Sequence, residues 1–171
     1  MATTYTLINS NVLSSSQASI TFSSIPATYT DLVLRASIRT DAAGTNYVLS
    51  RFNSDTAGNY SYTHLGGTGS AANSFSGINA TFNYYYNTST AADTSNTFSS
   101  LEIYVPSYLA SQNKPSSGFQ TSENNATAAY IGAEANLWRS TSAITTILLS
   151  PSASANFVSG SSFYLYGISN A

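Results

Sequence analysis

Apolar residues occupy every second position in several parts of the chain, most clearly in segments 31–39 and 101–105. Their alternating apolar residues are Leu32, Leu34, Ala36, Ile38, Leu101, Ile103 and Val105. Because successive side chains of a β-strand point to opposite faces, this pattern predicts strands with one buried face. Segments 143–149 and 162–168 are rich in β-branched and aromatic residues, and we predict that they form inner strands.

Weaker patterns of the same kind predict further strands over 4–12, 18–23, 46–53, 59–65, 78–86, 117–123 and 127–132. Clusters of Gly, Ser, Asn and Asp separate these segments, as expected of turns. The best helical candidate is 126–138, which overlaps the last of them. Many short strands joined by turns are typical of sandwiches. The sequence therefore predicts an all-β protein, a jelly-roll-like antiparallel β-sandwich, in which residues 1–171 form a single domain.

The composition changes the expected surface of this sandwich. Only 7% of the residues are charged, whereas Ser, Thr and Asn together account for 69 of the 171 residues. Outer strand faces and loops are thus predicted to carry uncharged hydrogen-bonding groups. Such a surface repels its own copies weakly, and it suits dense packing of copies or contact with sugar hydroxyls.

Several classes of function are disfavoured by the same composition. The chain has no Cys, which excludes disulfides, thiolate metal sites and a cysteine nucleophile. Five Lys and Arg against seven Asp and Glu give no basic surface for nucleic acid. The longest aliphatic run, 147–149, is far too short to span a membrane. We therefore expect no cofactor, no nucleic acid and no membrane as partners.

Candidate catalytic groups are few. His64 is the only histidine, so a Ser-His-Asp triad would require it, but no nucleophile-elbow motif occurs and we interpret it as a strand or loop residue. Glycoside hydrolysis would require two nearby carboxylates. Glu102 is the best placed acid, yet alternation puts it on the face opposite Leu101 and Ile103. The sequence accordingly predicts a protein that is not an enzyme, with a hydrolase as a remote alternative.

Segment 53–59 (NSDTAGN) resembles the start of a calcium loop. Its fifth position is Ala57, however, and the twelfth is His64 rather than the bidentate Glu of such loops. We predict a plain turn, closed by Asp and Asn side chains on backbone N–H groups.

The densest aromatic cluster is Tyr84-Tyr85-Tyr86, with Phe82 just before it. In a strand, Tyr84 and Tyr86 share one side and Tyr85 takes the other. Aromatic faces stack on sugars and anchor protein interfaces, so these three residues and Trp138 are candidate contacts for a partner or a glycan. The alternative is that they pack internally.

Four stretches carry a family resemblance: SITFSSIPATYTDLVLRASIR (19–39), RFNSDTAGNYSY (51–62), SLEIYVPSY (100–108) and FVSGSSFYLYGI (157–168). In this order they resemble small structural proteins of tailed bacteriophages, over nearly the whole chain. The resemblance implies a non-enzymatic virion component, assembled in the host cytoplasm, with the major capsid protein or the tail as partner. The leading interpretation is a capsid decoration or cement protein. The alternative is a carbohydrate- or receptor-binding β-sandwich of a tail or fibre.

A homo-oligomer is expected on independent grounds. Exposed sheet edges invite association unless charged residues or covering segments protect them. The chain has few charged residues and Lys114 is its sole lysine. We therefore predict that neighbouring copies cover the edges, with the Tyr84–Tyr86 strand as a contact and a trimer as the first guess.

Overall fold

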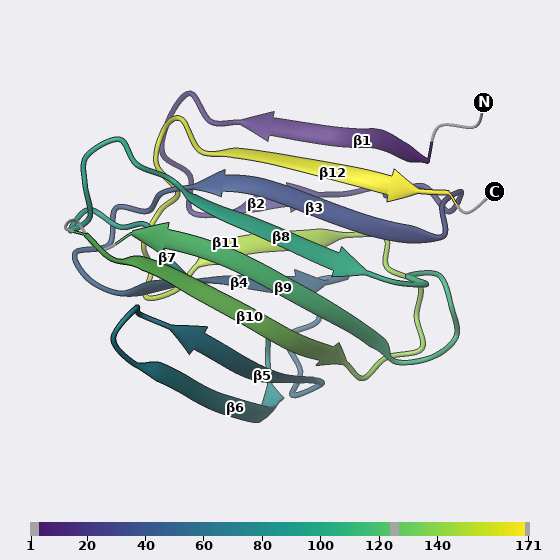
Figure 1. Cartoon of the computed structure of the whole chain (residues 1–171). Helices are drawn as coiled ribbons and strands as arrows, with labels where there is room; N and C mark the ends of the chain where they lie inside the picture. Colours follow the sequence, from purple (N-terminus) through teal and green to yellow (C-terminus); the bar gives the residue numbers. More distant parts are fainter. Residues whose placement is uncertain (1–3, 124–126, 170–171) are drawn as a thin grey trace.

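The computed structural model describes residues 4–123 and 127–169 and contains twelve strands, with no helix among these residues (Figure 1). The strands are β1 (Tyr5–Val12), β2 (Ile20–Phe22), β3 (Asp31–Ile38), β4 (Asn46–Phe52), β5 (Tyr60–Gly67), β6 (Ala72–Ala80), β7 (Asn83–Thr88), β8 (Ser99–Val105), β9 (Lys114–Glu123), β10 (Ala129–Trp138), β11 (Ile147–Pro151) and β12 (Ser162–Ile168). The described residues therefore include no helix that is long and apolar enough to cross a membrane.

The strands form two antiparallel sheets that face each other. One sheet has the order β1-β12-β3-β8-β9-β10-β5-β6, and the other has the order β2-β11-β4-β7. Figure 1 shows the eight-stranded sheet in front of the four-stranded sheet. The predicted all-β, antiparallel β-sandwich is confirmed.

The pairing is nested, as in a jelly roll. β1 pairs with β12, β2 with β11, β3 with β8 and β4 with β7, as if one long antiparallel hairpin had been rolled up. The β5–β6 hairpin and the β9–β10 hairpin lengthen the larger sheet. β12 lies between β1 and β3, so the segment 162–168 is an inner strand as predicted.

One ambiguous segment is decided by the structure, and one strand prediction is wrong. The segment 126–138, whose first residue lies outside the described part, was a helical candidate that overlapped a strand predicted over 127–132, and it is strand β10 over Ala129–Trp138. Its buried residues alternate, but they include Glu134 and Asn136, so hydrophobicity did not reveal the strand period. The segment 78–86, expected as one strand, instead contains the end of β6 and most of β7. The chain turns between them near Asn79, whose φ is 55°.

The apolar core lies between the sheets. The six residues expected there are all buried: Leu32, Leu34, Ile38, Leu101, Ile103 and Val105 are at most 3% exposed. They belong to one cluster with residues of both sheets, including Phe22 and Leu149 of the four-stranded sheet. One continuous core therefore joins the two sheets.

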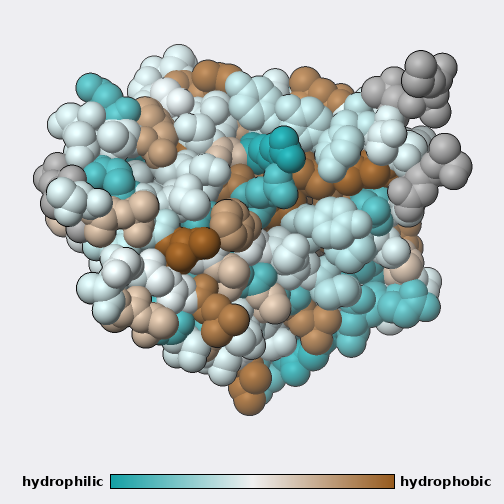
Figure 2. Space-filling model, viewed as in Figure 1, coloured by the Kyte–Doolittle hydropathy of each residue, from teal (hydrophilic) through white to brown (hydrophobic). Residues whose placement is uncertain are grey.

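The outer face of the eight-stranded sheet is nearly uncharged. Figure 2 shows it as mostly pale, with scattered brown patches over its β9–β10–β5–β6 half and a small teal patch near β3 with a brown band beside it. Leu65, Phe119 and Ile131 contribute exposed apolar side chains on neighbouring strands. Arg35 and Glu102 form an exposed ion pair on this face, with a 2.8 Å contact. Such an exposed pair adds little to stability.

We predict that Leu34→Ala lowers the free energy of unfolding by about 2–5 kcal/mol, because the variant loses buried apolar surface and leaves a cavity. Ser37→Ala, on the exposed face of the same strand, should change it by less than about 0.5 kcal/mol. Urea denaturation followed by tryptophan fluorescence measures both. A change below about 0.5 kcal/mol in Leu34→Ala would contradict the burial of this face.

Candidate functional site

The strand β7, which carries the three consecutive tyrosines, is an edge strand of the four-stranded sheet. It packs against β10, β9 and β5 of the opposite sheet. Tyr84 and Tyr86 share one side of β7, with ring centroids 6.3 Å apart, and Tyr85 lies on the other side, as predicted. The two sides have different surroundings.

Tyr85 is 0% exposed and belongs to the core between the sheets. A Cβ added to Gly118 on β9 would lie 2.4 Å from the Tyr85 ring, so this position has room only for glycine. Burial raises the pKa of the Tyr85 phenol above its ordinary value. Tyr85 therefore cannot contact a glycan or a partner from this position, which corrects that part of the prediction.

Trp138 is 2% exposed and is also a core residue. Its ring stacks on Tyr60, with centroids 6.4 Å apart, and meets Phe52 edge-on at 5.7 Å. The indole Nε1–H donates to Asp55 Oδ2 over 2.7 Å. Trp138 anchors the turn that contains Asp55 and offers no surface to a ligand, so its candidacy as a contact is also corrected.

The turn over 53–59 is closed by side chains, as predicted. Asp55 Oδ1 accepts from the backbone N–H of Ala57 at 2.9 Å, and Oδ2 accepts from Asn59 Nδ2 at 2.9 Å. Burial alone would raise the pKa of Asp55. The donors Asn59, Trp138 and Ala57 outweigh it, and the pKa is lowered. This is the arrangement of a structural turn.

On its other side, β7 contributes to an aromatic cluster made of Tyr47, Tyr62, His64, Phe75, Tyr84 and Tyr86. Tyr84 stacks on Tyr62 with centroids 4.8 Å apart, and Tyr86 stacks on Tyr47 at 5.3 Å. Phe75 meets both Tyr84 and Tyr86 edge-on. Tyr84 is 8% exposed, whereas Tyr86 is half-buried. Of the four candidate contacts, Tyr86 is the one that reaches the surface substantially.

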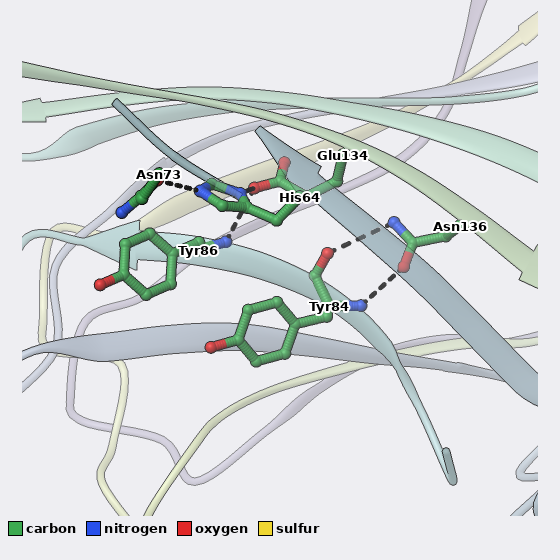
Figure 3. Close-up of polar contacts among 6 residues, drawn as sticks. All are labelled: His64, Asn73, Tyr84, Tyr86, Glu134 and Asn136. Carbon is green, nitrogen blue, oxygen red and sulfur yellow. Dashed lines mark hydrogen bonds and ion pairs between the residues drawn. The ribbon is translucent and has the colours of Figure 1, made fainter. Parts of the chain in front are cut away.

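Side chains of β10 supply hydrogen bonds to the free edge of β7 (Figure 3). The backbone N–H of Tyr84 donates to Asn136 Oδ1 at 2.8 Å, and Asn136 Nδ2 donates to the Tyr84 carbonyl at 3.3 Å. The backbone N–H of Tyr86 donates to Glu134 Oε1 at 3.1 Å. Amide and carboxylate groups of the opposite sheet thus take the place of a neighbouring strand.

His64 holds the Glu134 carboxylate in this position. Its Nδ1 lies 2.8 Å from Glu134 Oε1 and its Nε2 lies 3.2 Å from Asn73 Oδ1. The imidazole is 0% exposed and packs against the rings of Phe75 and Tyr86, at 4.5 and 4.8 Å. Both ring nitrogens face acceptor-bearing side chains rather than a hydroxyl nucleophile. The interpretation of His64 as a strand residue is confirmed, since it lies within β5.

Glu134 is the buried acid that sequence reasoning missed. Burial raises its pKa above the ordinary value, against the lowering effect of the Tyr86 N–H and of His64. Among the described residues, its Oε2 has no hydrogen-bond partner. The candidate acid Glu102 lies instead on the outer face, beside Arg35, as alternation predicted. The strand predicted over 127–132 ended before Glu134, and only its extension to Trp138 would have placed Gly132, Glu134, Asn136 and Trp138 on one inward face.

No protein-family model matches the chain, and comparison with curated proteins finds no match. Within residues 4–123 and 127–169, no group of three or more His, Cys, Asp or Glu side chains is placed to hold a metal ion.

We predict that Asn136→Ala lowers the free energy of unfolding by about 1–3 kcal/mol, because it leaves buried backbone groups of Tyr84 without partners. Exchange of the Tyr84 amide proton, followed by NMR, should accelerate in the same variant. Asn11→Ala, an exposed position on β1, is the matched control and should change neither quantity. Unchanged exchange at Tyr84 in Asn136→Ala would contradict the bridging role of Asn136.

A second prediction concerns pH. Because the folded-state pKa of Glu134 lies above its unfolded value, its stabilising contribution is complete below about pH 4.5 and is lost as the pH rises through the folded-state pKa. The lowered pKa values of Asp41 and Asp55 act in the opposite direction, and only as the pH falls below about 3.8. The free energy of unfolding should therefore fall as the pH rises from about 4.5 through the folded-state pKa of Glu134.

Urea denaturation at several pH values measures this slope. Glu134→Gln keeps an acceptor for the Tyr86 N–H and should flatten the slope. Glu102→Gln, on the exposed face, should leave the slope as in the wild type. Equal slopes in Glu134→Gln and the wild type would show that Glu134 does not cause the dependence.

Proposed function

We propose that this protein is a non-enzymatic structural component of a tailed-bacteriophage virion, which decorates the outside of the capsid as a homo-oligomer. The resemblance of four sequence stretches to small structural proteins of such phages supports the virion assignment. The observation that carries the proposal of self-assembly is the state of the four sheet edges.

The two edges of the four-stranded sheet are protected. β2 is only three residues long. The free edge of β7 is bonded to Asn136 and Glu134 from the opposite sheet. Short edge strands and covered backbone groups are the usual means by which proteins avoid pairing with other chains.

The two edges of the eight-stranded sheet lack such protection. β1 and β6 are eight and nine residues long, and neither contains a charged residue or a proline. Both present exposed apolar side chains, Leu7 at 50% on β1 and Ile78 at 77% on β6. Their pairing with β12 and β5 contains one register shift each, so each edge is regular over part of its length. These two strands are the natural sites for addition of a strand from another copy.

The charges of the chain do little to oppose such contact. Lys114, the sole lysine, is 1% exposed and its Nζ donates to the carbonyl oxygens of Ala110 and Gln112. Glu134 and Asp31 are also buried. Arg39 donates to backbone carbonyl oxygens of Asp93, Thr94 and Thr97. Copies therefore meet with little charge repulsion at their edges.

The two open edges lie at opposite ends of one sheet. Pairing of β6 in one copy with β1 in the next would continue the sheet and, if the rotation closes, give a ring such as a trimer. The expected interface exceeds about 1,000 Å² of total buried surface. The Tyr84–Tyr86 strand, favoured from sequence as the contact, is replaced in this proposal by β1 and β6 because its own edge is already bonded.

We predict that light scattering of the wild-type protein at micromolar concentration gives the mass of an oligomer. Ser76→Lys on β6 and Ser10→Lys on β1 should shift it toward the monomer, because a charged edge disfavours strand pairing. Ser37→Lys, on the inner strand β3, is the matched control. A monomeric wild type at all concentrations, or an oligomer that ignores both edge variants, would contradict assembly through these edges.

The virion assignment has its own test. Mass spectrometry of purified particles of the phage that encodes the chain should detect it in many copies. Antibody labelling viewed by electron microscopy should then mark the capsid surface. Absence from the particle would overturn the proposal, and labelling of the tail alone would replace decoration of the capsid by a tail role.

A further inference from the structure

A pocket of about 370 Å³ opens at the end of the molecule where the chain leaves β7. Residues from separate segments meet there: Thr68 follows β5, Tyr86 and Asn87 end β7, Thr90 and Asp93 belong to the β7–β8 loop, and Tyr130 lies on β10. Its size lies within the range of roughly 300–1,000 Å³ that is typical of small-molecule sites. It is separate from the β1 and β6 edges.

Two tyrosines provide aromatic surface in this pocket. The Tyr86 ring is held in place by Tyr47, His64 and Phe75, with centroids 4.8–5.3 Å away. Figure 3 shows its hydroxyl pointing away from the Glu134 network. Tyr130 is half-buried and makes no ring contact with the other described aromatic residues. One ring is therefore fixed by aromatic packing, and the second ring lines the same pocket.

Polar groups of the pocket are positioned by the loop that carries them. Asp93 Oδ2 accepts from the backbone N–H of Thr90 at 2.7 Å and from its Oγ1 at 3.1 Å. The Asp93 carbonyl accepts from Arg39 Nη2 at 3.1 Å. Asn87 has a left-handed φ of 68°, and its Nδ2 donates to Ser122 Oγ at 3.2 Å. The Asp93 carboxylate and the Asn87 amide thus lie beside the tyrosines and are already partly ordered. Binding would therefore cost less conformational entropy at these two side chains.

The charge of the lining residues restricts the ligand. Asp93 is the charged residue among them, and none is basic. A phosphate, sulfate or carboxylate group would find no cation among the lining residues, because Arg39 is turned to backbone carbonyls of the loop, and it would meet the Asp93 carboxylate. A ligand with several neutral hydroxyl groups and an apolar face fits better. Its hydroxyls could donate to the Asp93 carboxylate and to the side-chain carbonyl of Asn87, while its C–H groups stack on a tyrosine ring.

We propose that this pocket binds a neutral saccharide, with Tyr130 as the stacking ring and with Asp93 and Asn87 as hydrogen-bond partners of its hydroxyls. The inference goes beyond the proposed structural role and does not depend on it. A sugar site at one end of the sandwich would give each copy on a particle surface a weak contact with host or environmental glycans, strengthened by the number of copies.

The test uses the full chain. An array that displays neutral, sialylated and sulfated glycans identifies the class that binds. Saturation-transfer NMR with methyl β-D-galactoside, methyl β-D-glucoside and methyl α-D-mannoside, each at about 10 mM, detects binding of single sugars in the millimolar range. Tyr130→Ala should weaken binding of the best glycan by about tenfold or more, because the stacking ring is lost. Tyr130→Phe should retain most of the affinity.

Two further variants keep the result interpretable. Asp93→Asn keeps an oxygen for Thr90 and should also weaken binding, whereas Tyr164→Ala, on the outer face of β12, should not. Circular dichroism and light scattering of each variant separate loss of the site from loss of folding or assembly. The proposal is overturned by a lack of binding to any neutral glycan, by binding of acidic glycans alone, or by folded Tyr130→Ala and Asp93→Asn variants that bind as the wild type does.

Discussion

Backbone groups on the outer edge of β7 are buried against the eight-stranded sheet, and side chains of β10 supply their hydrogen bonds. A buried N–H or C=O group without a partner costs free energy comparable to a lost hydrogen bond, so an edge that packs against another sheet must be satisfied from that sheet. The backbone of a strand in the facing sheet cannot pair with the outer edge of β7. The side chains of Asn136 and Glu134 supply the hydrogen bonds instead, and for this reason polar residues occupy the inward face of β10.

Further positions follow from this constraint. Glu134 in the interior needs a partner, and His64 on β5 provides one at 2.8 Å. The two side chains then need space. A Cβ on Gly132 would lie 2.9 Å from Glu134 Oε1, and a Cβ on Gly66 would lie 2.4 Å from His64 Nε2. The sole histidine, a buried acid and two glycines thus form one structural unit around the β7 edge.

Because β7 is bonded within its own chain, the molecule has one closed side and two open ends. The closed side places Tyr84 and Tyr86 in a rigid aromatic cluster, and the outer end of that cluster forms one wall of the pocket that we assign to a saccharide. The open ends are β1 and β6, which carry no charge. The proposed assembly and the proposed glycan binding would therefore use separate parts of the surface, so copies joined through their edges would keep their pockets accessible.

Alternation of apolar residues was enough to predict the all-β class and the burial of Leu34 and Ile103, because strand period and burial are local properties of a sequence. The number of short strands between turns indicated a sandwich, but the nested pairing of its strands is decided by the tertiary structure. The fate of the tyrosines was not predictable in this way. Tyr84, Tyr85 and Tyr86 are identical in type, and their different burial depends on which strand of the other sheet lies beside each one. Glu134 and Asn136 were missed for a related reason, since an inward strand face made of polar residues has no hydrophobic period. Their pairing with the β7 backbone joins segments that are distant in the sequence, and so does the pocket that both Tyr130 and Asp93 line. Only the tertiary packing brings these segments together.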